Sequence, residues 1–145
     1  MDDTLKQIWT RGLAEHFRAE NAHDVAAILG TFAAGAAVIW GGRTYEGQEA
    51  IRRLHEGMGF GGDGAFADLE VVEIQRHYSD RAIVVEQRLR GRHTGPWEGI
   101  APTGKLIDVP VCTVYELDND GRITSERPYV DRWMLWKQLG GGARA

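Results

Sequence analysis

The sequence predicts a single α+β domain, in which about three N-terminal helices pack on a mainly antiparallel sheet. Apolar residues recur every three to four positions in the first half of the chain, which is the period of a helix. In the second half they alternate, as they do in strands. Helices followed by consecutive strands with short turns are typical of α+β folds with an antiparallel sheet.

Three helices and one short strand are expected in the first half. The first helix begins at a cap supplied by Asp2, Asp3 or Thr4, and its apolar stripe contains Leu5, Ile8, Trp9, Leu13 and Phe17. The second helix is expected over residues 24–32 and ends at Gly35. A strand over 36–40 and a third helix over 48–57 complete this half.

Four strands are expected in the second half. Their predicted ranges are 66–77, 82–93, 107–117 and 122–133. The turn between the last two, over residues 118–121, ends in Gly121, which tolerates the positive φ that such turns need. We assign residues 1–140 to one domain and expect the Gly-rich tail, residues 141–145, to be flexible.

Composition excludes several classes of protein. The chain of 145 residues is 43% hydrophobic and carries a net charge of −4, so neither disorder nor binding to nucleic acid or an acidic membrane is expected. The N-terminus lacks the apolar segment of a signal peptide, and no apolar run is long enough to span a bilayer. The single cysteine, Cys112, excludes an intrachain disulfide. These features predict a cytoplasmic protein.

Two glycine-rich segments resemble nucleotide-binding motifs but lack the required context. The segment 57–62 has the spacing of a dinucleotide fingerprint, yet it follows a helix and leads into a loop. The segment 99–105 has the spacing of a phosphate loop, but Leu106 occupies the Ser/Thr position and a strand follows. We interpret both as loops and expect no cofactor.

Strand alternation selects two candidate catalytic residues. His93 shares a face of its strand with Ile83, Val85 and Leu89. Asp131 shares a face of the last predicted strand with aromatic residues. A carboxylate on such a face loses hydration, which raises its pKa and suits a general acid or base.

The sequence indicates no chemical role for the other histidines or the cysteine. His16, His23, His55 and His77 are expected on polar or helical surfaces, and they lack the short spacing of metal ligands, so no metal site is predicted. Cys112 is interpreted as a small buried hydrophobic residue.

Several short motifs resemble the SnoaL-like polyketide (ester) cyclase family. In the second half they are the segments 91–95, 99–105 and 120–123, then Asp131, and the closing segment 137–140. The first half agrees more loosely, through the segments 21–24 and 45–47.

The resemblance implies a cone-shaped fold, shared with nuclear transport factor 2 and ketosteroid isomerase, in which a strongly curved sheet encloses a pocket. It implies intramolecular aldol chemistry on a small hydrophobic carbonyl compound, without metal or cofactor. Asp131 would then exchange protons with the substrate, and His93 would donate a hydrogen bond to the developing enolate. The expected substrate-binding residues are Trp40, Trp97, Tyr115, Tyr129 and Trp133, with Arg127 for a polar group.

Two other functions stay open. The segment 102–105 and Asp131 also resemble limonene-epoxide-hydrolase-like proteins, which suggests hydrolysis or dehydration in the same pocket. That family's Arg-x-Asp pair is incomplete here, since the nearest match is Arg88-Leu89-Arg90. A binding module without chemistry is the third alternative. Because an open sheet face with Arg and aromatic residues usually needs cover, we also expect a homodimer.

Overall fold

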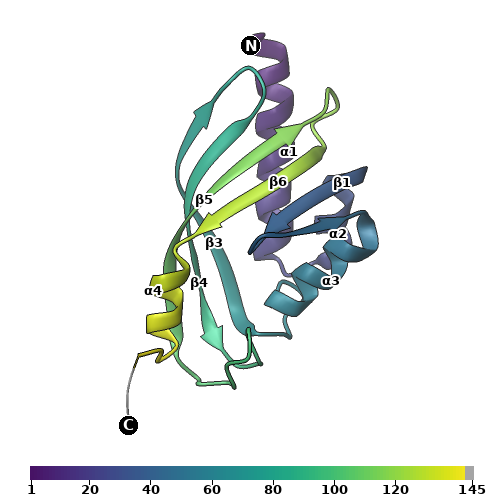
Figure 1. Cartoon of the computed structure of the whole chain (residues 1–145). Helices are drawn as coiled ribbons and strands as arrows, with labels where there is room; N and C mark the ends of the chain where they lie inside the picture. Colours follow the sequence, from purple (N-terminus) through teal and green to yellow (C-terminus); the bar gives the residue numbers. More distant parts are fainter. Residues whose placement is uncertain (143–145) are drawn as a thin grey trace.

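The computed structural model describes residues 1–142, in which helices flank one curved sheet of six strands (Figure 1). The helices are α1 (Asp3–Asn21), α2 (Val25–Gly30), α3 (Gln48–Met58) and α4 (Arg132–Gln138). The strands are β1 (Phe32–Trp40), β2 (Arg43–Glu46), β3 (Phe66–Tyr78), β4 (Ile83–His93), β5 (Leu106–Leu117) and β6 (Ile123–Val130). The predicted α+β class is therefore confirmed.

The strand order in the sheet is β2-β1-β6-β5-β4-β3. All neighbouring pairs are antiparallel except β1 and β6, which run parallel. The strands from the second half of the chain thus form one continuous meander, and β1 with β2 extends it along the β6 edge. Figure 1 shows the long α1 crossing the sheet, with α2 and α3 beside β1 and β2. Among residues 1–142, no helix is long and apolar enough to cross a membrane.

The core lies between the helices and the inner face of the sheet. Alternate residues of β4 and β5 point inward, so that Ile83, Val85, Val109 and Tyr115 are fully buried. Asp2 caps helix α1, and its side chain accepts a hydrogen bond from the Thr4 amide. The predicted cap and helix are confirmed.

The predicted end of the last strand is wrong. Strand β6 ends at Val130 instead of continuing to residue 133, and α4 follows at once. The Asp131 carboxylate accepts a hydrogen bond from the Met134 amide and so caps this helix. Leu135 and Leu139, four residues apart, are buried and fix the helix against the core.

Two smaller differences occur around the first strand. The strand begins at Phe32 rather than at residue 36, so α2 is shorter than predicted and Gly35 lies within β1. The short strand β2 was not predicted. Of the predicted flexible tail, residues 143–145 lie outside the described part of the chain, and the Gly141 amide donates to the Trp136 carbonyl.

Candidate functional site

A pocket on the inner face of the sheet combines an apolar wall with a polar end. Its cavity volume is about 40 Å³. Small-molecule sites span about 300–1,000 Å³, so the pocket is narrow, and a ligand larger than a few atoms must displace side chains of its wall to enter. The apolar lining consists of Val38, Trp40, Leu54, Met58, Phe60, Val71, Leu89, Val111 and Pro128. The polar lining consists of Glu20, His55, Gln87, Thr113 and Glu126.

Helical periodicity directs two of these polar residues inward, together with His16, which is buried beside them. On α1, His16 lies three residues after the buried Leu13, and Glu20 follows one turn later. On α3, His55 lies four residues after the buried Ile51. Each side chain therefore projects from the core-facing side of its helix.

A bulge in β6 turns Glu126 inward. Glu116 of β5 pairs with Ser125 and Leu117 pairs with Ile123, so β6 carries one extra residue at this point. An extra residue reverses the alternation of side chains beyond it. Glu126 and Pro128 consequently line the pocket, whereas an unbroken strand from Ile123 would have directed them away.

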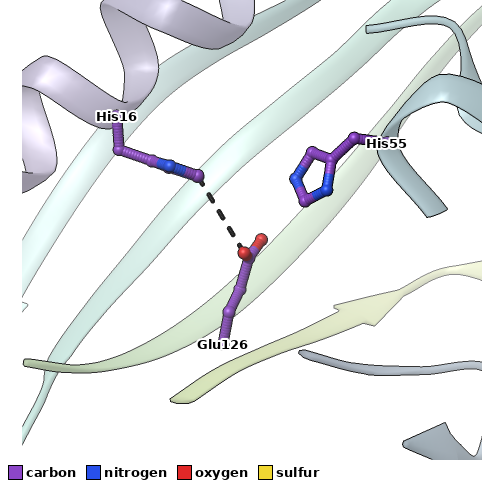
Figure 2. Close-up of side chains that lie close together, drawn as sticks. All are labelled: His16, His55 and Glu126. Carbon is purple, nitrogen blue, oxygen red and sulfur yellow. Dashed lines mark ion pairs between the residues drawn. The ribbon is translucent and has the colours of Figure 1, made fainter. Parts of the chain in front are cut away.

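Two imidazoles and two carboxylates meet at the polar end of the pocket, and we call His16, Glu20, His55 and Glu126 the polar cluster. The Nε2 atom of His16 lies 3.3 Å from Oε1 of Glu20 and 3.9 Å from Oε2 of Glu126. The Nε2 atom of His55 lies 3.7 Å from Oε1 of Glu20. Figure 2 shows the side chains of His16, His55 and Glu126 converging from α1, α3 and β6.

Hydrogen bonds fix the orientation of both imidazoles. The Thr31 hydroxyl donates to the Ile28 carbonyl and therefore accepts from Nδ1 of His16, 2.8 Å away. Nδ1 of His55 donates to the Ile51 carbonyl at 2.8 Å. Each ring is held through its Nδ1 hydrogen bond, and its Nε2 atom, on the opposite side of the ring, faces the carboxylates.

Burial and charge shift the pKa values within the polar cluster in opposite directions. Burial favours the neutral form of Glu20, but the adjacent imidazoles of His16 and His55 outweigh it and lower the pKa of Glu20. For Glu126 burial prevails, aided by the charge of Glu20, and its pKa is raised. Burial works against the charged form of His55, yet Glu20 and Glu126 raise its pKa above 6.5.

Several buried polar atoms at this end of the pocket have no hydrogen-bond partner within residues 1–142. Buried polar groups are normally paired, so such a concentration indicates a site that receives water, an ion or a ligand. The atoms are His16 Nε2, Glu20 Oε2, Gln87 Oε1, Thr113 Oγ1, Tyr115 OH and Glu126 Oε2. Burial, followed by the charges of Glu126 and Glu20, raises the pKa of Tyr115 well above its ordinary value.

The structure places His93 on the inner face of β4, as strand alternation predicts. Its ring is fully buried and packs on Phe66, with the ring centroids 5.4 Å apart. The Thr103 amide donates to Nδ1 at 3.2 Å, which leaves the proton on Nε2, and that atom has no partner in the described chain. His93 does not line the pocket that holds the polar cluster.

Asp131 does not meet His93. The premise that Asp131 faces the pocket is wrong, because the strand ends before it and the side chain is an exposed helix cap. The Asp131 amide pairs with Pro110 of β5, whereas the His93 amide pairs with Lys105. Five residues of strand separate these two positions, or about 16 Å at 3.3 Å per residue.

The predicted wall residues separate into three groups. Trp40 lines the pocket. Trp97 lines a neighbouring hollow together with Trp40, and the centroids of the two rings are 6.1 Å apart. Tyr115 is buried beside His16, with ring centroids 5.9 Å apart. The expectation that the remaining residues face the pocket is wrong, because of the bulge and the end of β6. Tyr129 and Trp133 are exposed, and Arg127 binds Glu116 at 2.6 Å on the other side of β6.

The prediction that His16 and His55 lie on helix surfaces is wrong. Both rings are buried, and both positions fall on the apolar stripe of their own helix. That stripe was a usable signal, since a polar residue in phase with buried ones must find a partner. A search for metal ligands at short sequence spacing misses them, because His16, His55 and Glu126 lie far apart in the chain.

Comparison with known proteins identifies the family. The model of the SnoaL-like domain matches residues 13–126, which is most of the chain and includes all four residues of the polar cluster. No match was found among curated protein sequences.

Solved structures share the fold. A candidate SnoaL-like polyketide cyclase from Jannaschia sp. CCS1 is 24% identical, with a TM-score of 0.77, over 94% of this chain and 96% of that chain. A protein of ketosteroid isomerase-like fold from Catenulispora acidiphila DSM 44928, in complex with trimethylamine, is 20% identical. Its TM-score is 0.73, and the match covers 90% of this chain and 92% of that chain. The epoxide hydrolase/cyclase-like enzyme SalBIII, which has a role in pyran ring formation in the polyether salinomycin, is 20% identical. Its TM-score is 0.72, and the match covers 90% of this chain and 94% of that chain. At these identities the likeness shows a common fold.

Proposed function

Because the chain belongs to the SnoaL-like domain family, we propose that it is an enzyme that performs acid/base chemistry on a small, mainly apolar carbonyl compound. The observation that carries this proposal is the position of Glu126. Its buried carboxylate faces an apolar pocket and lies beside the polar cluster's imidazoles. A carboxylate held away from water and next to bound substrate is suited to remove a proton from carbon.

The proposed reaction is a cyclase-like intramolecular aldol addition. Glu126 removes a proton from the carbon next to one carbonyl group of the substrate. The resulting enolate attacks a second carbonyl carbon in the same molecule, so a carbon–carbon bond forms and an alkoxide oxygen develops. Glu126 then returns the proton to that oxygen, which regenerates the carboxylate and completes a step in which nothing is oxidised or reduced.

Neighbouring polar groups support the charge that develops on oxygen. Thr113 lines the pocket with an unpartnered hydroxyl, and Gln87 of the adjacent strand lines it as well. Hydrogen-bond donors already held in place stabilise an enolate without the cost of reorientation. The apolar wall, which includes Trp40 and Leu54, excludes water and holds the hydrocarbon part.

Proton exchange tests the proposal without knowledge of the natural substrate. Metal-free protein, prepared by dialysis against EDTA, is incubated in D₂O with acetylacetone, 1,3-cyclohexanedione and 2-tetralone, and deuterium incorporation is followed by NMR. We expect catalysed exchange in the wild type and a loss of about 100-fold or more in Glu126→Gln. Glu116→Gln, on the other side of the sheet, is the matched control and should exchange normally. Equal exchange in Glu126→Gln and the wild type contradicts the proposal.

Epoxide opening by water is the second candidate, because two carboxylates face the same pocket. Glu20 and Glu126 both line it, and such a reaction needs one group to activate water and another to protonate the leaving oxygen. Turnover of small epoxides in ¹⁸O-labelled water distinguishes the two candidates, since only hydrolysis places the label in a diol.

A further inference from the structure

We propose that the polar cluster is a binding site for a divalent transition-metal ion, with His16, His55 and Glu126 as ligands. One ligand atom from each of these residues lies within 4.8 Å of the other two, and all three side chains are buried. The proposal goes beyond the proposed function and does not rest on it.

The ligand atoms need only a small contraction to surround an ion. Around a tetrahedral Zn²⁺ with bonds of about 2.0–2.1 Å, neighbouring ligand atoms lie roughly 3.4 Å apart. Nε2 of His16 and Oε2 of Glu126 are 3.9 Å apart. In Figure 2 these two atoms and the ring of His55 border one common space. Since the three ligand atoms lie within 4.8 Å of one another, they must approach by at most about 1.4 Å, through rotation about side-chain torsions.

Both imidazoles are oriented as metal-binding histidines are. A metal-binding histidine usually donates its second ring N–H to a carbonyl, carboxylate or similar acceptor, which leaves a lone pair on the other nitrogen. His55 makes this bond to the Ile51 carbonyl, and His16 makes it to the Thr31 hydroxyl. In their neutral form both rings therefore present the Nε2 lone pair to the centre of the cluster.

Unpartnered atoms and charge also favour a cation. Among residues 1–142, Nε2 of His16 and Oε2 of Glu126 are buried without hydrogen-bond partners. Buried carboxylates are stable only when their charge is compensated. One divalent ion neutralises Glu126 together with Glu20, whose Oε1 atom stands 3.3 Å and 3.7 Å from the two imidazoles.

The donor set selects the class of metal. Two imidazoles and one carboxylate suit Zn²⁺, Co²⁺ or Fe²⁺, whereas Mg²⁺ and Ca²⁺ prefer all-oxygen sites. Three protein ligands leave further positions for water or for an oxygen of Glu20. Both Glu20 and His55 line the pocket, so an ion held here is accessible to a pocket ligand.

Zinc binding to the untagged, EDTA-dialysed protein tests the proposal. Isothermal titration with Zn²⁺, followed by metal analysis after gel filtration, should show one ion per chain, and Mg²⁺ and Ca²⁺ should give no heat. His55→Gln and Glu126→Gln should each weaken Zn²⁺ binding by about 100-fold or more, since each loses one of three ligands. Substitution with Co²⁺ should give visible absorption bands that report nitrogen and oxygen ligands without reference to activity.

His77→Gln is the matched control. His77 also contacts a carboxylate, with 2.7 Å between Nε2 and Oε2 of Glu86, but this pair is exposed on the sheet. Binding should be unchanged in this variant. Circular dichroism confirms that each variant is folded, and the wild-type titration is decisive even if one of them is not. Absence of bound Zn²⁺ in the folded wild type, or equal binding by His55→Gln, overturns the proposal.

The tests of the two proposals are independent. The exchange assay is run on metal-free protein, whereas the titration needs no substrate. Zinc binding with no exchange by the metal-free protein refutes the proposed function alone. Exchange by a protein that binds no zinc refutes the metal site alone.

Discussion

The imidazole of His16 and the carboxylate of Glu20 lie one helical turn apart on α1, and their closest atoms are 3.3 Å apart in the buried interior. Glu20 also faces His55 at 3.7 Å, so a single carboxylate connects α1 to α3. Two elements that are distant in sequence are thus joined by one buried charge.

Removal of the Glu20 charge should destabilise the fold. Glu20→Gln leaves the buried imidazoles without their closest carboxylate, and breaking a buried ion pair in this way costs roughly 3–5 kcal/mol. Urea unfolding followed by circular dichroism measures the loss. Glu15→Gln on the same helix is the control, because the Glu15–Arg18 pair is exposed and should contribute less than about 1 kcal/mol. A similar loss in both variants would contradict a special role for Glu20.

The charge of His55 should make stability depend on pH. Because its pKa is raised in the folded state, protonated His55 stabilises the fold fully below its unfolded value of 6.5. That contribution is lost as the pH rises through the folded-state pKa. In EDTA, the difference in unfolding free energy between the wild type and His55→Gln should therefore shrink with increasing pH. NMR titration of the His55 ring checks the direction, and a midpoint below 6.5 would refute it.

Asp131 and Glu126 should differ in their effect on activity. Asp131→Asn keeps a residue that caps helices well and should change neither stability nor deuterium exchange appreciably. Asp131→Ala loses the cap of α4 and should cost about 1 kcal/mol of stability. If Asp131→Asn abolished exchange while Glu126→Gln retained it, the role that the family resemblance implies for Asp131 would be restored.

The contact between Gly12 and Gly121 should tolerate no side chain. A Cβ atom on Gly12 would lie 2.0 Å from the Gly121 carbonyl oxygen, so α1 and the β5–β6 turn could not keep their distance. We expect Gly12→Ala to lower stability by about 1–3 kcal/mol, and to weaken the polar cluster because α1 carries His16 and Glu20. Gly30→Ala meets nothing within 4 Å and serves as the control in thermal denaturation.

The homodimer expected from the sequence stays a prediction. Ile74 and Tyr129 line a hollow on the outer side of the sheet and are 62% and 63% exposed, which leaves apolar surface uncovered. Light scattering should give twice the mass of the chain for the wild type and a smaller mass for Tyr129→Glu. A monomeric wild type at micromolar concentration would refute the prediction.

Local periodicity was sufficient to predict most of the fold. The helical stripe ending at Phe17 and the alternation in β4 each depend on residues a few positions apart, and both elements formed as expected. The same periodicity placed His93 on the inner face. It also put His16 and His55 in phase with buried residues, although their burial was not inferred from it.

Only the tertiary structure decided which polar residues share a site. The sequence determined an α+β domain with polar residues on several apolar faces, because those patterns are local. One extra residue in β6 reverses the side of the sheet on which Glu126 and Arg127 lie, and no local pattern reveals it. The meeting of α1, α3 and β6 then brings together residues more than a hundred positions apart. The candidate acid/base residue is therefore Glu126 and not Asp131, because proximity in a folded chain is set by packing between elements and not by spacing along the sequence.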